Sequence, residues 1–332
     1  MSNTTKVVLI VVSVLVVCII GAAVTLGLVY SGTGHFSLGG LFKSSTIDVD
    51  ESADFNLDGV TRLNIQNVSG RIFVKPGEPG VTLTGRVMTN SEQEKFLSVK
   101  TEGDTLTIKS DIDTFYPNFI NGDLVLTVYV PEDMGIDTAV SSTSASTEIS
   151  GISFGSLSVQ STSGTISVAD CAGGTMKVGV TSGGVKVGQL DFSDVDVNCT
   201  SGSVSVEDVT GSVRAGSTSG AVRVVNAAGT VEISNTSGSA TLMQAHQDIQ
   251  PVRINTVSGS IKVTLNPGSA FDIDVETTSG GFSTDYELTV SGKLSSKVVG
   301  EDISGKVNGG GSMVQMSTVS GGISLSKAEL AE

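Results

Sequence analysis

The chain of 332 residues has no tryptophan, only six prolines and an aromatic content of 5%. Its core must therefore consist mainly of Val, Ile, Leu and Ala. It has 19 Lys and Arg against 34 Asp and Glu, giving a formal net charge of −15 that is spread along the chain. Because nucleic-acid binding needs clustered cations that displace counterions from phosphates, this composition argues against a nucleic-acid partner.

Residues that could carry catalysis or hold a metal are also scarce. The two histidines, His35 and His246, are far apart, and the three cysteines show no CxxC spacing. No histidine triad, zinc pattern or cofactor motif is therefore recognisable. The densest acidic stretch, "DFSDVDV" at 191–197, is expected to be a solvated loop, with a chance ion site as the alternative. The sequence predicts a protein that is not an enzyme and has no catalytic, cofactor-binding or metal-binding residues.

The longest hydrophobic run covers residues 7–30 and contains no charged residue. This length suffices to span a bilayer and exceeds the apolar stretch of a typical signal peptide. The sequence therefore predicts a short tail at 1–6, a transmembrane helix at 7–30 and a Gly/Ser-rich spacer at 31–45. Lys6 is the only basic residue before the run, so we expect the N-terminus inside the cell and the bulk of the chain outside.

A tripeptide T-S-G or V-S-G recurs through the rest of the chain. Between Gly164 and Gly280 the steps from one such glycine to the next are 19, 19, 18, 18, 21 and 21 residues. The tripeptide ends at Gly70, Gly164, Gly183, Gly202, Gly220, Gly238, Gly259, Gly280 and Gly321. An alternating apolar and polar segment precedes and follows each tripeptide, as in "VDV" and "VSV" around Gly202, which indicates two short strands per repeat.

The spacing within each repeat is constant. The central polar residues of the two strands are 9 apart in seven repeats, from Ser158 and Ser167 to Asp274 and Ser283. All variation in length falls in the return connection. A constant corner and a variable one predict a parallel β-solenoid of about 18–21 residues per coil. We call each coil a rung.

The outward residues support this register. If rungs stack in chain order, the first-strand lane reads Lys177, Asp196, Arg214, Glu232, Arg253, Asp274. The second-strand lane reads Ser167, Lys186, Ser205, Arg223, Thr241, Lys262, Ser283. Neither lane places like charges on adjacent strands, where they would repel. The cations Lys186, Arg223 and Lys262 form a candidate ligand-facing lane for an anionic glycan or peptide; alternatively they keep the sheet face soluble.

The two ends differ from the regular rungs. We expect an N-terminal β cap at 46–135, solenoid rungs at 136–326 and a C-terminal tail at 327–332. An early rung is centred on Asn64 and Phe73, and a late one on Gln315 and Ser324. Cys199 precedes a T-S-G corner whereas Cys171 lies in a return connection, so no disulfide is expected between these opposite edges.

The T/V-S-G rungs, the segment "LVLTVYVPED" before them and the leader helix resemble the bacterial putative-adhesin domain family of unknown function. The resemblance covers roughly residues 46–326. It implies a right-handed β-helix and an envelope-associated protein, and it brings no catalytic residues.

We therefore expect a membrane-anchored, extracytoplasmic and non-catalytic module for adhesion or envelope-stress contacts. Its partners would be the membrane and either another envelope protein or a surface glycan. The alternatives are a glycan-active β-helix lyase or hydrolase, and a purely structural surface spacer.

Overall fold

A computed structural model describes residues 45–89, 95–110, 124–290, 295–296 and 301–329. The chain divides into two units, 1–45 and 46–332, and every described residue except Ser45 belongs to the second. The predicted tail, membrane helix and spacer lie outside the described residues, apart from Ser45 at the end of the spacer. The described part contains no helix, and hence none long and apolar enough to span a membrane.

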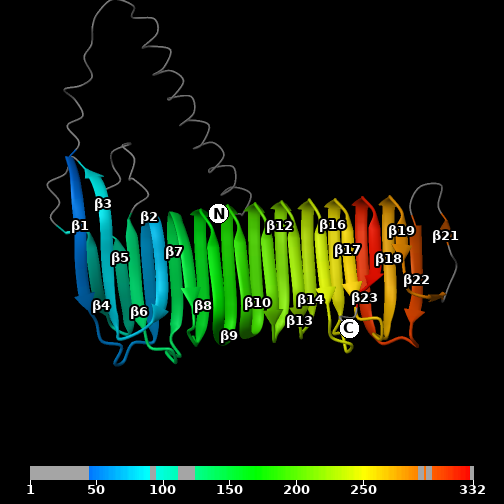
Figure 1. Cartoon of the computed structure of the whole chain (residues 1–332), viewed down its shortest axis with the longest axis horizontal. Helices are drawn as coiled ribbons and strands as arrows, with labels where there is room; N and C mark the ends of the chain where they lie inside the picture. Colours follow the sequence, from blue (N-terminus) through cyan, green and yellow to red (C-terminus); the bar gives the residue numbers. More distant parts are fainter. Residues whose placement is uncertain (1–44, 90–94, 111–123, 291–294, 297–300, 330–332) are drawn as a thin grey trace, which may run out of the picture. The chain divides into compact units, whose positions relative to one another are not determined.

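The described residues form 24 β-strands joined in one sheet, which confirms the predicted all-β class. Figure 1 shows the strands side by side in one long row. The regular rungs are built from β7 (Asp137–Ser150), β8 (Ser156–Ser163), β9 (Ile166–Ser182), β10 (Val185–Ser201), β11 (Val204–Val209), β12 (Ser212–Ser219), β13 (Val222–Ala227), β14 (Val231–Ser237), β15 (Ala240–Gln244), β16 (Val252–Ser258) and β17 (Ile261–Leu265).

Neighbouring rungs pair in parallel and in the predicted register. Asp196 of β10 lies between Lys177 and Arg214, and Lys186 lies between Ser167 and Ser205. The register continues through Arg253 in the first lane and Lys262 in the second. The constant offset of 9 residues therefore corresponds to real pairing across these rungs.

The inward residues of the strands form a continuous apolar core. On β10, Val185, Val187, Val195 and Val197 are each at most 3% exposed, while Lys186 and Asp196, between the two members of each pair, face outward. Burying such a side chain stabilises the fold by about 1.5–3 kcal/mol. Phe192 is also buried, because 191–197 continues β10; the expectation of a loop there was wrong.

The T-S-G corner requires glycine for two separate reasons. Gly202 has φ +149°, a conformation that other residues rarely adopt. A Cβ built on Gly202 would lie 1.7 Å from the carbonyl oxygen of Gly183, the corner glycine of the preceding rung. The corner glycines thus stack on one another with no space for a side chain.

The return corner is more regular than the sequence suggested. Asp170, Gln189, Asp208 and Asn226 occupy it in successive rungs, with φ between 51° and 56°. Further along, the Gln244 side chain completes the ladder: its amide donates to the Ala227 carbonyl at 2.8 Å and accepts from the Ala227 N–H at 3.0 Å. The sequence predicted only that the length of this connection varies, and it did not reveal this repeated left-handed position.

The N-terminal strands form the first end of the stack. β2 holds the early rung and pairs with β7, so that Asn64 lies beside Ala139 and Phe73 beside Glu148. Its other side pairs with β5 and β6, and antiparallel strands extend the sheet from there. These strands are β1 (Ser45–Asp54), β2 (Arg62–Pro76), β3 (Gly80–Thr89), β4 (Leu97–Glu102), β5 (Thr105–Ser110) and β6 (Val125–Val130).

At the C-terminal end the rungs do not stack in chain order. The last rung, made by β23 and β24, lies between the rung of β16 and β17 and the rung of β18 and β19 (Figure 1). Antiparallel pairing of β22 with β18 then follows. These strands are β18 (Phe271–Ser279), β19 (Phe282–Thr284), β20 (Thr289–Val290), β21 (Ser295–Ser296), β22 (Glu301–Val307), β23 (Ser312–Ser320) and β24 (Ile323–Lys327).

Because the rung of β23 and β24 is inserted there, the neighbours predicted at the C-terminal end of both lanes were wrong. Arg253 neighbours Gln315 and not Asp274, while Lys262 neighbours Ser324 and not Ser283. Asp274 instead accepts a hydrogen bond from the Gln315 amide at 3.4 Å. The alternation of charge is therefore continuous only from Lys177 to Arg253.

Candidate functional site

A groove crosses six rungs beside the T-S-G corner. Its volume is about 690 Å³, and its walls are two outward columns of side chains. We call the first-strand lane the charged lane. One groove column lies two residues after the central residue of each first strand and comprises Gln160, Gly179, Asn198, Gly216, Ser234 and Asn255. The other is the first corner position and comprises Thr181, Thr200, Thr218, Thr236 and Val257.

Amides and glycines alternate over the first four members of the first column, from Gln160 to Gly216. A Cβ on Gly179 would lie 2.3 Å from the Gln160 Oε1, and one on Gly216 would lie 2.8 Å from the Asn198 Oδ1. Gln160 and Asn198 therefore each lie over a glycine of the next rung, whereas Asn255 lies beside Ser317. This arrangement keeps the groove open where two neighbouring long side chains would fill it.

Between these columns runs a buried column whose members line the groove: Ser161, Val180, Cys199, Ser217, Asn235 and Thr256. Ser217 donates to the Gly202 carbonyl at 3.2 Å, and the Asn235 amide donates to the Gly220 carbonyl at 2.8 Å. These bonds tie each rung to the preceding corner. Asn235 Oδ1 and Thr256 Oγ1, on side chains that are each 5% exposed, have no hydrogen-bond partner among the described residues.

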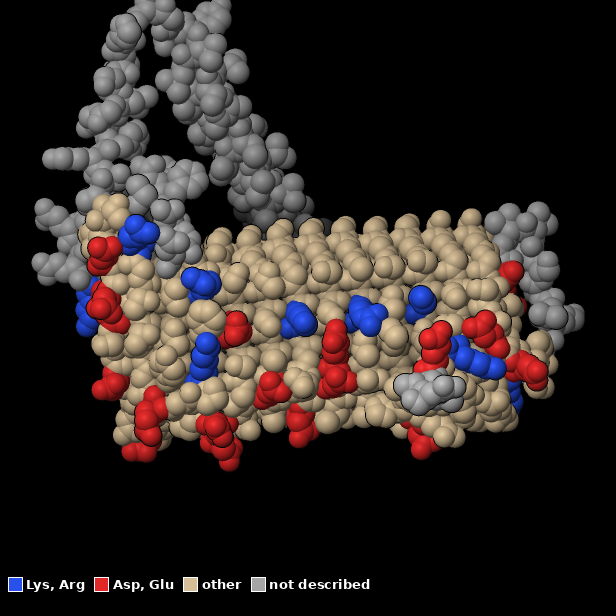
Figure 2. All heavy atoms as spheres, in the orientation of Figure 1, with Lys and Arg blue, Asp and Glu red and all other residues tan. Residues whose placement is uncertain are grey.

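The groove and the corner beside it carry no charged residue. Seven successive rungs lack Asp, Glu, Lys, Arg and His in this strip, although the chain carries 53 acidic and basic residues (19 + 34). The segments are 160–165, 179–184, 198–203, 216–221, 234–239, 255–260 and 317–322. Figure 2 shows an uncharged band along the edge of the stack at which β12 and β16 end in Figure 1.

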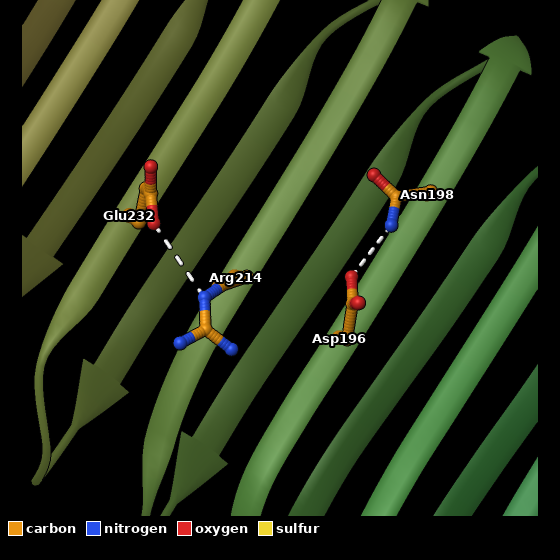
Figure 3. Close-up of polar contacts among 4 residues, drawn as sticks. All are labelled: Asp196, Asn198, Arg214 and Glu232. Atoms are coloured by element: carbon orange, nitrogen blue, oxygen red, sulfur yellow. Dashed lines mark hydrogen bonds and ion pairs between the residues drawn. The ribbon is translucent and has the colours of Figure 1, made fainter.

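The charged lane borders the groove without entering it. Arg214 Nε lies 3.5 Å from Glu232 Oε2, and both side chains are about half exposed, so the pair contributes at most about 1 kcal/mol. Asp196 instead accepts a hydrogen bond from the Asn198 amide of the groove wall at 2.5 Å (Figure 3). The lane therefore positions one groove amide as well as separating like charges.

The structure does not bring the predicted cations together. Lys186, Arg223 and Lys262 alternate with Ser205 and Thr241, so successive cations are about 9–10 Å apart. Figure 2 shows basic side chains as separate points and not as a continuous patch on the face drawn.

Acidic residues also surround one of these cations. A second depression of about 370 Å³ is lined by Lys186 together with Glu207 and Asp208. Because carboxylates share this depression with the lysine, its charge is mixed, and an anion gains little there.

Among the described residues, Cys171 and Cys199 are free thiols. Burial raises the pKa of the Cys171 thiol and that of the Cys199 thiol, which disfavours the reactive thiolate. Cys199 occupies the buried column of the groove, where its thiol lies 3.3 Å from the Gly183 carbonyl oxygen. Among the described residues no cluster of three metal-ligating side chains occurs, including at 191–197.

Sequence reasoning missed the groove. Its signal was present in the second residue after the central residue of each first strand, where Gln160, Gly179, Asn198 and Gly216 alternate between long and absent side chains. The pattern becomes visible only when the rungs are aligned, because its members are 18 or 19 residues apart.

A family model described as Toastrack DUF4097 matches residues 60–326. The chain belongs to this family. No curated protein matches it.

Three solved structures show low sequence identity over most of the chain. A "putative cell adhesion protein" from Clostridium sporogenes is 13% identical, covering 85% of this chain and 100% of its own, with a TM-score of 0.26. A "putative adhesin" from Bacteroides fragilis is 12% identical, covering 86% and 97%, with a TM-score of 0.41. A "putative lipid binding protein" from Parabacteroides distasonis is 13% identical, covering 86% and 97%, with a TM-score of 0.38. The family assignment rests on the sequence match alone.

Proposed function

We propose that this Toastrack protein is a non-catalytic binding module that acts in adhesion or contact at the cell envelope. The observation that carries the proposal is the uncharged groove, which repeats similar polar groups across six rungs. Such a surface offers many equivalent weak contacts to an extended partner, which is how repeat proteins commonly bind.

The proposal includes a location and a handedness. We infer that residues 7–30 anchor the chain in the cell membrane, with the N-terminus inside and residues 46–332 outside. We also infer that the rungs wind as a right-handed solenoid, because parallel strands joined by crossovers almost always take that hand.

Two measurements on intact cells test this function. Protease added outside cells that produce the full chain should remove the 46–332 region, and a protected region would contradict the location. Such cells should also adhere better than cells lacking the chain to at least one surface in a panel of envelope proteins and polysaccharides. Adhesion to none of them, or cleavage of a polysaccharide by the purified full chain, would refute a non-catalytic adhesive role.

A further inference from the structure

The groove has the polarity of a site for an uncharged, hydroxyl-rich ligand. Its walls present the amides of Gln160, Asn198 and Asn255 together with serine and threonine hydroxyls. Amides and hydroxyls both donate and accept hydrogen bonds, as sugar hydroxyls do. A charged ligand would lose its hydration in the groove without meeting an opposite charge.

Two buried oxygen atoms in the groove need hydrogen-bond partners that the described residues do not supply. Asn235 Oδ1 is an amide oxygen and can only accept, and the nitrogen of the same amide donates to the Gly220 carbonyl. Thr256 Oγ1 belongs to the next rung in the same buried column. Both oxygens have almost no exposed surface, so neighbouring wall side chains must shift before a ligand donor reaches them. Because a buried polar atom without a partner is unfavourable, an O–H or N–H group that reaches these oxygens gains a hydrogen bond.

The position of the groove discriminates between an extended peptide and a glycan. Peptides commonly bind sheets by adding a strand to an open edge. Here the groove lies across the faces of β10, β12, β14 and β16, whose main-chain groups are paired with neighbouring rungs. Only side chains are available, and they repeat every 4.7–4.9 Å or so along the groove. A sugar in an extended polysaccharide advances by a similar distance.

We propose that this groove binds an extended neutral polysaccharide, with Asn235 and Thr256 as hydrogen-bonding anchors. This inference rests on the proposed function and specifies its ligand. The groove lining contains no aromatic residue, so each sugar contributes little and affinity depends on chain length. Oligosaccharides that span all six rungs should bind better than those that span two.

The test uses the full chain in detergent micelles and biolayer interferometry. The probes are dextran, mannan, arabinoxylan and a mixed-linkage glucan, with polygalacturonate as the anionic comparator. We expect at least one neutral polysaccharide to bind and polygalacturonate not to bind. Binding of polygalacturonate alone, or of no neutral polysaccharide, would overturn the inference.

Two substitutions localise the binding. Thr256→Val replaces the hydroxyl with a methyl group and should weaken binding roughly three- to ten-fold, the loss of one hydrogen bond. Ser234→Ile places a branched side chain in the groove and should weaken binding by more than about ten-fold, because it excludes the chain. Both variants should unfold at or above the temperature of the native protein, since Thr256 Oγ1 has no partner and Ser234 is exposed.

Matched controls separate the groove from the rest of the fold. Thr147→Val removes another buried hydroxyl without a partner, but outside the groove. Thr241→Ile places the same branched side chain on the lane between Arg223 and Lys262. Neither control should change the affinity. If a neutral polysaccharide binds and all four variants retain its full affinity, the binding function stands and the groove is the wrong site.

Discussion

The stacking of corner glycines leads to a prediction about stability. Replacement of Gly202 by alanine introduces two costs. A non-glycine residue at φ +149° is strained by about 1–3 kcal/mol. The new Cβ, 1.7 Å from the Gly183 carbonyl oxygen, forces a backbone shift that costs about another 1–3 kcal/mol. We therefore expect Gly202→Ala to lower the free energy of unfolding by about 2–6 kcal/mol.

Two other glycines separate these costs. Gly259 has no left-handed φ, but its Cβ would lie 1.9 Å from the Gly238 carbonyl oxygen, so Gly259→Ala measures the steric cost alone. Gly103 has φ +63° and no atom within 4 Å of a Cβ, so Gly103→Ala measures the conformational cost alone, about 1–2 kcal/mol.

The assay is urea unfolding of the full chain, followed by circular dichroism. Because repeat proteins can unfold in stages, tryptic digestion at intermediate urea should accompany it and show which rungs open first. Gly202→Ala should have the largest effect, and cleavage should begin near its rung. If Gly259→Ala were as stable as the native protein, the corner glycines would not be sterically stacked and the reasoning would fail.

Single contacts give three further predictions. The Tyr286 hydroxyl donates to the Leu265 and Asn266 carbonyls at 2.9 Å each, and burial raises its pKa to about 12. Because its pKa is higher in the folded chain, Tyr286 stabilises the fold below about pH 10, and this stabilisation is lost as pH rises toward 12. The melting temperature of Tyr286→Phe should therefore fall less between about pH 10 and pH 12 than that of the native protein. The double variant Arg253→Cys with Gln315→Cys should oxidise to a disulfide, because these residues are neighbours on adjacent rungs. The double variant Arg253→Cys with Asp274→Cys should not, because the rung of Gln315 lies between them. Mass spectrometry under non-reducing conditions detects the disulfide and so shows whether Gln315 or Asp274 is the neighbour of Arg253. Arg214→Ala should lower the free energy of unfolding by no more than about 1 kcal/mol, and a larger loss in urea unfolding would show that the exposed pair with Glu232 is undervalued.

Much of the fold could be predicted because its register is local. The fixed distance from Ser158 to Ser167, and its equivalents, is set by one corner whose glycine cannot change, so pairing through Arg253 and Lys262 could be read directly. The stacking order of the last rungs could not be predicted from the sequence. Every rung presents the same inward alternation and the same corner, so nothing local distinguishes the neighbour of Arg253 as Gln315 and not Asp274.

The candidate site was less predictable for a related reason. Its amide and glycine alternation has meaning only across rungs, where the Asn198 side chain occupies the space left by Gly216. The unpartnered oxygens of Asn235 and Thr256 depend on side-chain positions that a sequence does not contain. The cations Lys186, Arg223 and Lys262 of the second-strand lane were easier to notice, because charge can be seen at each residue of the sequence. The structure nevertheless keeps these three side chains apart.

The most direct test of the binding surface is photo-crosslinking in cells that produce the full chain. A benzophenone amino acid replaces Ser234 in the groove or Thr241 on the second-strand lane, two positions on β14 and β15, the two strands of one rung. After irradiation, the Ser234 position should form carbohydrate-containing adducts and the Thr241 position should not. Adducts that form only from Thr241 would contradict the groove as the binding surface and favour the lane of Lys186, Arg223 and Lys262.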